Sequence, residues 1–257
     1  MKFGFTKLSV IPVRAEAKEQ SEMVTQLLFG DIFTVLIEKK NWLHIQIDAD
    51  GYEGWIDKTL FFEINEDQFI QLKHSKKSVN KSLVCTIESD DEKIQLLSGS
   101  VFSLLENDHI MIGDKSYKVH NFQQAEGLDI RKEMIETALS YLNAPYLWGG
   151  KHPFGIDCSG FSQVIYKIHG IQIPRDASQQ VSLGVSRNFI NEAQAGDLAF
   201  FDNEDGNVIH VGIILEGGKI IHASGKVRID KIDHQGIYNL ETKSYSHKLR
   251  VIQNIIG

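Results

Sequence analysis

Residues 156–168 read Ile-Asp-Cys-Ser-Gly-Phe-Ser-Gln-Val-Ile-Tyr-Lys-Ile, and this stretch decides the fold of the second half of the chain. Its apolar residues recur at helical spacing from Phe161 to Ile168, and Gly170 follows at the expected stop. The pattern predicts a helix that begins near Cys158. The positive end of the helix dipole and the unpaired backbone N–H groups there would lower the pKa of this thiol and stabilise an oxyanion. The stretch therefore predicts a nucleophilic cysteine.

A buried structural cysteine is the alternative interpretation of any single thiol. The polar neighbours of Cys158 and the following Gly160 weaken that alternative here. We adopt it for Cys85, the second of the two cysteines, because it lies in the middle of an apolar strand pattern. We expect both thiols to be reduced, because no signal peptide is visible at the N-terminus.

Helical and strand patterns surround the central stretch. Asp129 precedes apolar residues at helical spacing up to Leu142, which predicts a helix with an aspartate N-cap. Asp176–Gln179 (DASQ) has the capping-box pattern and predicts a third helix. From Asp197 onward the chain returns to patterns typical of strands, over residues 198–201, 208–215 and 220–223. Helices followed by strands indicate an α+β domain over residues 126–257.

The first half of the chain reads as short strands separated by turns. Residues 33–37, 42–47 and 54–56 are rich in β-branched and aromatic residues, with Asn, Asp and Gly between them. A weaker copy of the pattern follows at residues 84–87, 101–105, 110–112 and 117–119. The sequence therefore predicts two small β-barrels, over residues 1–62 and 63–125, in front of the α+β domain.

Composition and charge exclude several classes of function. The 257 residues contain 27 Lys and Arg against 34 Asp and Glu, which gives a net charge of −7. A nucleic-acid partner is not expected, because phosphate binding needs a clustered basic surface. No apolar run approaches the roughly 18–20 residues of a membrane span, so no membrane partner is expected either. We expect a monomer without a metal or another cofactor. We expect it to be cytoplasmic, with a periplasmic or secreted location as the alternative if a signal peptide has been removed.

Two histidines are candidates for the base that a cysteine nucleophile needs. His210 and His222 lie in consecutive predicted strands around the turn at residues 216–219. A three-residue loop places both rings on one face of the hairpin, but leaves His210 about four positions, roughly 13 Å, from the point opposite His222. A bulge or a strong twist would then be required to join them. Ordinary, partly buried histidines remain the alternative, since the chain has ten histidines.

The motifs of the second half resemble those of the NlpC/P60 cysteine peptidases. They occur in the family's order as Tyr146–Gly150 (YLWGG), Asp157–Phe161 (DCSGF), Pro174–Gln180 (PRDASQQ), Ala195–Leu198 (AGDL), His210–Ile213 (HVGI) and Ile221–Ser224 (IHAS). The first half resembles the bacterial SH3 domains of γ-D-glutamyl-L-diamino acid endopeptidases of the dipeptidyl-peptidase VI type. This weaker resemblance rests on Ser21–Met23 (SEM), Leu28–Asp31 (LFGD) and Gly51–Trp55 (GYEGW).

The resemblance implies a papain-like core and a catalytic triad. Cys158 would be the nucleophile, His210 the general base and His222 the residue that orients the base. Ala195 departs from the family, which usually has proline there. We expect this difference to make the loop less rigid and to leave the reaction unaffected. The resemblance also implies a set of substrate-binding residues: Tyr146, Trp148, Asp157, Ser159, Arg175, Asp176, Glu22 and Tyr52.

Three of these residues would form a pocket for a free amine. Asp176 matches a carboxylate that, in this subfamily, holds the N-terminal amine of an L-Ala residue, and Glu22 and Tyr52 would complete the pocket from the first SH3 domain. A plain N-cap for Asp176 and solvated loop positions for the other two are the alternatives.

Three functions are consistent with these motifs. The first is a recycling enzyme that cleaves L-Ala-γ-D-Glu from the diamino acid of a released murein peptide. The second is a hydrolase of intact peptidoglycan that uses SH3 domains as wall-binding modules. The third is a catalytically inactive binding protein, which the intact Cys–His–His set disfavours. The absence of a visible signal peptide favours the first over the second.

Overall fold

The helix expected at residue 158 forms in the computed structural model, which describes residues 1–257. Helix α3 (Cys158–Ile168) begins after Asp157, whose side chain accepts the backbone N–H of Gly160, and Gly170 follows its last turn with φ of 78°. All eleven residues of α3 are buried. The helix is therefore covered on its polar and its apolar faces, which is unusual for an amphipathic sequence.

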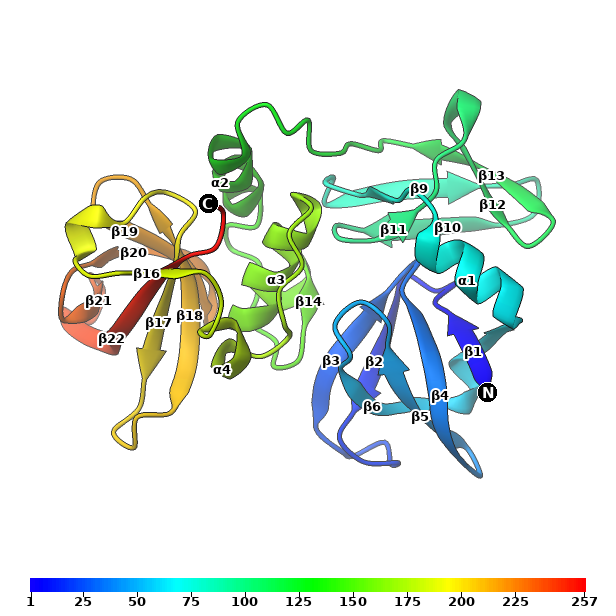
Figure 1. Cartoon of the computed structure of the whole chain (residues 1–257), viewed down its shortest axis with the longest axis horizontal. Coiled ribbons are helices and arrows are strands. Elements are labelled where there is room, and N and C mark those ends of the chain that lie inside the picture. The colour runs from blue at the N-terminus through cyan, green and yellow to red at the C-terminus, as the bar shows by residue number, and fades with distance from the viewer. The chain divides into compact units, whose positions relative to one another are not determined.

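Two compact units make up the chain, residues 1–125 and 126–257. Figure 1 shows α3 with helix α2 in the second unit, in green, and the sheet of that unit in yellow to red. Helix α3 packs against two neighbouring strands of the sheet, β18 (Val208–Leu215) and β19 (Lys219–Ser224).

The sheet of the second unit closes on itself. Its order is β16-β22-β17-β18-β19-β20-β21, and β21 also pairs with β22. Strands β17 to β22 therefore form a closed ring, which leaves only β16 as an added strand. The remaining strands have these bounds: β16 (Val185–Arg187), β17 (Leu198–Asp202), β20 (Lys226–Ile232), β21 (Gly236–Asn239) and β22 (Ser244–Asn254). The hairpin β14 (Lys151–His152) and β15 (Gly155–Ile156) precedes α3.

Of the two helices predicted on either side of α3, the first forms as predicted and the second is only one turn long. The helix behind Asp129 is confirmed as α2 (Ile130–Ser140), and the Asp129 side chain accepts the N–H of Lys132. The third helix forms only as the single turn α4 (Ala177–Gln180). Its predicted capping box is wrong, because the side chain of Asp176 makes no cap hydrogen bond.

The first unit contains a seven-stranded sheet, of order β3-β2-β6-β5-β4-β1-β7, and a four-stranded sheet, of order β10-β9-β13-β12. The seven strands are β1 (Lys2–Phe5), β2 (Val10–Arg14), β3 (Met23–Leu28), β4 (Ile32–Lys39), β5 (Trp42–Ile47), β6 (Glu53–Asp57) and β7 (Phe62–Ile64). The four strands are β9 (Val84–Glu88), β10 (Lys93–Leu97), β12 (His109–Ile112) and β13 (Lys115–His120), and β8 (Ser78–Val79) pairs with β11 (Val101–Phe102). Short 3-10 helices lie at Lys58–Leu60, Glu106–Asp108 and Ile190–Glu192.

The two sheets of the first unit share a hydrophobic core. One cluster of buried side chains joins Phe3, Phe5 and Phe29 from the first sheet region to Cys85 and Tyr117 of the second. Helix α1 (Glu66–His74) connects the sheets, and Asn65 and Gln68 form a capping box at its start. The α+β fold class with a small β-barrel in front is confirmed, while the boundary between two barrels at residues 62 and 63 stays a prediction.

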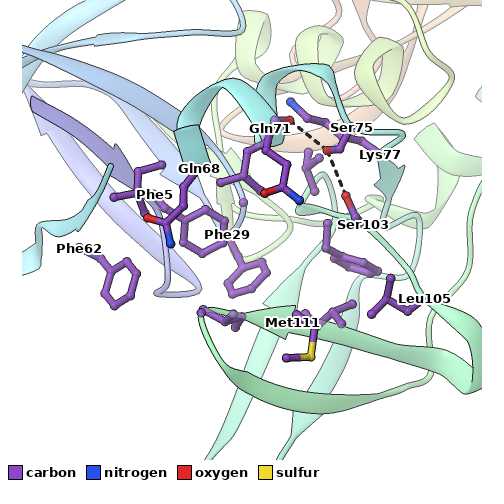
Figure 2. Close-up of a pocket in the computed structure, with 18 of the residues that line it drawn as sticks. Phe5, Phe29, Phe62, Gln68, Gln71, Ser75, Lys77, Ser103, Leu105 and Met111 are labelled. Carbon is purple, nitrogen blue, oxygen red and sulfur yellow. Dashed lines mark hydrogen bonds between the residues drawn. The ribbon is translucent and has the colours of Figure 1, made fainter. Parts of the chain in front are cut away.

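A cavity of about 440 Å³ interrupts this shared core. Figure 2 shows Phe5, Phe29 and Phe62 on one side of it and Met111 on another, with Gln68 of α1 nearby. All of its lining residues belong to the first unit, and none of them is a predicted site residue. In the chain as a whole, no helix is long and apolar enough to cross a membrane.

Candidate active site

The thiol of Cys158 lies at the point where helix α3 meets strand β18. Its side chain is buried, and the backbone N–H groups of Val211 and Ser159 hydrogen-bond to the sulfur. Val211 directly follows His210 on β18, so this contact brings the backbone beside the predicted base to the predicted nucleophile. The structure thus joins two motifs that lie some fifty residues apart in the sequence.

Burial changes the expected acidity of this thiol. The first turn of a helix lowers a thiol pKa, but removal from water raises the pKa of Cys158 to about 11, and the charge of Asp157 adds to this rise. The sequence-based expectation of an intrinsically low pKa is therefore wrong. Burial also holds the pKa of His210 well below its usual value, and His247 and His222 lower it further. Burial thus favours the neutral thiol and the neutral imidazole, and we expect the thiolate to form together with the imidazolium.

The two predicted histidines meet through the register of the β18–β19 hairpin. Leu215 pairs with Lys219 and Ile213 pairs with Ile221, so the same register continued places Gly212 opposite His222. His210 is then two positions from that point, on the same face, which is a diagonal separation of about 7 Å. The expected four-position offset, and the bulge needed to correct it, are both wrong. The Nε2 atom of His210 lies 2.8 Å from the Nδ1 atom of His222.

Gly212 leaves the space through which the His222 side chain reaches His210. A Cβ atom at Gly212 would lie 2.8 Å from the Cβ of His222 and 2.7 Å from the Cδ1 of Ile220, closer than real Cβ contacts. His222 must therefore move if residue 212 carries a side chain.

We expect Gly212→Ala to lower kcat by up to about 100-fold, because a misplacement of about 1 Å at a catalytic group has that effect. Steady-state kinetics on a murein peptide would measure it. Gly54→Ala is a matched control in the first unit, where a Cβ would lie 2.5 Å from the Cγ1 of Val13. Gly54→Ala should lower the free energy of unfolding without a comparable loss of kcat. An equal loss in both variants would contradict the positional argument.

A hydrogen-bond chain continues beyond the histidine pair to residues that the sequence did not indicate. The Nε2 atom of His222 lies 3.0 Å from Oδ2 of Asp230. Arg228 donates to both oxygens of this carboxylate, from Nε at 2.7 Å and from Nη2 at 3.0 Å. Asp230 and Arg228 both lie on β20, and Arg228 is directly opposite His222. Only the register of β19 and β20 could have revealed them.

His247 of strand β22 is the third residue that the sequence analysis missed. Its ring stacks on that of His210, with ring centres 4.1 Å apart and ring planes 22° from parallel. Burial, followed by the charge of His222, lowers the pKa of His247 to about 4. His247 is therefore neutral near pH 7 and covers one face of the predicted base without placing a second charge beside it.

Asp157, Ser159 and Arg175 form a buried cluster under the first turn of α3. Arg175 donates to both carboxylate oxygens of Asp157, at 3.1 and 2.6 Å, and to the hydroxyl of Ser159 at 2.8 Å. The same carboxylate accepts the N–H groups of Gly160 and Gly149. These bonds fix the helix start that carries Cys158. A role in substrate binding stays a prediction for all three.

Tyr146 is half-buried in the second unit. Burial, with smaller contributions from Cys158 and Asp157, raises the pKa of its hydroxyl to about 12. Trp148 is 61% exposed. Asp176 is half-buried at the start of α4, whereas Glu22, which is exposed, and Tyr52 belong to the first unit. The amine pocket built from these last three residues stays a prediction.

Comparisons with known proteins agree with this geometry. A model of the NlpC/P60 family matches residues 143–245, and a model of the bacterial dipeptidyl-peptidase SH3 domain matches residues 13–59. The first range contains Cys158, His210 and His222.

Similar proteins cover most of the chain. A γ-D-glutamyl-L-lysine dipeptidyl-peptidase of Bacillus subtilis is 31% identical over 217 residues, which are 77% of this chain and 71% of that protein. Dipeptidyl-peptidase 6 of Lysinibacillus sphaericus is 29% identical, over 86% of this chain and 88% of its own. The crystal structure of an NlpC/P60 family protein from Bacillus cereus has the same fold, with a TM-score of 0.82 at 22% identity, over 99% of this chain and 100% of that one. With its family motifs and its buried cysteine–histidine site, the chain belongs to the NlpC/P60 family and is a cysteine peptidase that acts on peptidoglycan peptides.

Proposed function

We propose that this peptidase hydrolyses the bond between γ-D-Glu and the diamino acid in murein peptides with a free N-terminal L-Ala, and so releases L-Ala-γ-D-Glu. The observation that carries the proposal is the hydrogen-bonded set at α3 and β18, in which the backbone beside His210 binds the Cys158 sulfur and His222 holds the far nitrogen of His210. The names of relatives at about 30% identity support the γ-D-glutamyl specificity.

The reaction follows from which atoms of the site are engaged. Because Nε2 of His210 bonds His222, Nδ1 is the nitrogen that takes the proton of Cys158. The sulfur then attacks the γ-carbonyl carbon, and the N–H groups at the start of α3 stabilise the oxyanion. His210 returns its proton to the amine of the departing diamino acid. Water, deprotonated by His210, then cleaves the thioester and releases the dipeptide.

In this proposal, the preference for released peptides depends on the free amine of the substrate. An α-amine is cationic at neutral pH, and Asp176, Glu22 and the Tyr52 hydroxyl are the groups that we propose to bind it. An acidic pocket left without its cation costs on the order of 1–3 kcal/mol. Acetylated peptides and intact murein, in which the stem L-Ala is amide-linked, should then be poor substrates.

The test compares L-Ala-γ-D-Glu-L-Lys with its N-acetylated form, using chromatography to quantify the released dipeptide. We expect the acetylated peptide to be cleaved more than tenfold more slowly, and Asp176→Ala to raise KM for the free peptide. The Cys158→Ala variant is the control for background hydrolysis. Efficient cleavage of the acetylated peptide, or of intact sacculi, would overturn the proposal and favour a cell-wall hydrolase with SH3 domains as wall-binding modules. A parallel series with meso-diaminopimelate in place of lysine identifies the diamino acid.

A further inference from the structure

The carboxylate behind the histidine pair determines which ring nitrogens carry protons. Asp230 is 3% exposed and is bonded on both oxygens by Arg228. Although burial acts to raise its pKa, the hydrogen bonds from His222 and Arg228 hold the pKa of Asp230 below its usual value. Asp230 is therefore ionised at neutral pH, and an ionised carboxylate can only accept hydrogen bonds.

The protonation of both histidines follows from this acceptor. Nε2 of His222 must carry the proton, because it faces Oδ2 of Asp230 at 3.0 Å. For Nδ1 of His210 to accept the thiol proton, its Nε2 must donate to Nδ1 of His222 across 2.8 Å, which leaves the single proton of the His222 ring on Nε2. The remaining lone pair of His210 is on Nδ1. Each ring is thereby held in the tautomer that leaves a basic nitrogen for a thiol proton.

We propose that Asp230 is a positioning residue of this peptidase, which fixes the tautomers of His222 and His210 and stabilises the imidazolium formed when Cys158 loses its proton. The inference deepens the proposed function and rests on it for the role of His210, but not for the identity of the substrate. It gives a reason for a buried ion pair on β20, a kind of interaction that seldom adds net stability by itself.

The other groups around the pair do not supply this negative charge. His247 from β22 stacks on His210 and is neutral near pH 7, and Cys158 from α3 is the proton donor itself. Asp157 is paired with Arg175 through two hydrogen bonds. Glu241 bonds the outer nitrogen of Arg228 at 3.2 Å, on the side away from the carboxylate. Asp230 is thus the anion in hydrogen-bond contact with the histidine pair.

The test is the pH dependence of alkylation of Cys158 by iodoacetamide in the full chain, with the site identified by mass spectrometry. In Asp230→Asn the amide has nearly the same shape but no charge, so the imidazolium–thiolate pair is less stable. We expect the midpoint of the alkylation profile to move up by at least one pH unit, with at least a tenfold slower rate at pH 7. The difference should disappear above about pH 11, where the thiol ionises without its partner.

Asp202→Asn is the matched control. Asp202 lies on β17 of the same sheet, and its side chain is 8% exposed and accepts a hydrogen bond from Arg250 at 3.1 Å rather than from a histidine of the pair. It should leave the alkylation profile unchanged. If Asp230→Asn does not fold, the double variant Arg228→Gln, Asp230→Asn removes both charges and should show the same shift, since no buried charge is left unpaired.

The ¹⁵N chemical shifts of the imidazoles give a second readout that a merely structural role would not move. We expect the protonated nitrogen to be Nε2 in both His222 and His210 of the parent chain, and this preference to weaken in Asp230→Asn. An unchanged alkylation midpoint and unchanged tautomers in a folded variant would overturn the inference. Neither measurement uses substrate, so failure of the parent chain to cleave a murein peptide would count against the proposed function alone.

Discussion

Replacement of Cys158 by alanine is expected to abolish hydrolysis of murein peptides, because it removes the sulfur that forms the acyl intermediate. The parent chain should also react with iodoacetamide at Cys158 far faster than at Cys85. Both thiols are free and buried, but burial alone raises the pKa of Cys85 to about 12, and no histidine bonds it. Peptide-cleavage assays and mass spectrometry of the alkylated chain measure the two effects.

Cys85→Ala is the matched control for this experiment. Cys85 belongs to the shared core of the first unit, so its loss should affect stability and leave the chemistry in place. An active Cys158→Ala variant, or equal labelling of the two thiols, would exclude Cys158 as the nucleophile.

His210→Ala should lose nearly all turnover, since general acid–base catalysis contributes about 10²–10⁴-fold and His210 is the group that we propose to take the thiol proton. His222→Gln should be milder, because a glutamine amide can still accept the hydrogen bond from Nε2 of His210. His222→Ala should fall between the two. Measurement of kcat and KM for the three variants separates the base from the residue that orients it.

His169→Ala is a suitable control for the loss of a histidine elsewhere in the same unit. The ring of His169 lies at the end of α3 and bonds the hydroxyl of Thr137 at 3.0 Å, outside the catalytic chain. A larger loss of kcat in His222→Ala than in His210→Ala would reverse the two assigned roles.

Much of the fold was predictable because its signals are local. Apolar residues at helical spacing marked α2 and α3, with an aspartate N-cap before α2, and runs of apolar, β-branched and aromatic residues marked β5, β9, β17 and β18. Local signals also misled, as at Asp176, where the capping-box pattern is present but the helix is one turn long. Helix α1 had an equally local signal in Asn65 and Gln68, which the strand-rich surroundings obscured.

The acidity of Cys158 shows what a local pattern leaves out. The helix dipole and the free N–H groups are properties of a few neighbouring residues, and they lower the pKa of a thiol. Burial depends on every segment that covers the helix, and here it prevails and raises the pKa to about 11. The reactivity of the thiol therefore depends on its partner rather than on its position alone.

The motifs along the chain identify the residues with the chemistry of a cysteine peptidase, namely Cys158, His210 and His222. How these residues are joined depends on strand pairing between segments far apart in the sequence. The hairpin register put Gly212, which has no side chain, opposite His222, and the pairing of β19 with β20 brought Asp230 and Arg228 behind the histidines. A one-residue change of register turns every side chain to the other face of a sheet, so such partners cannot be assigned until the strands are paired in space.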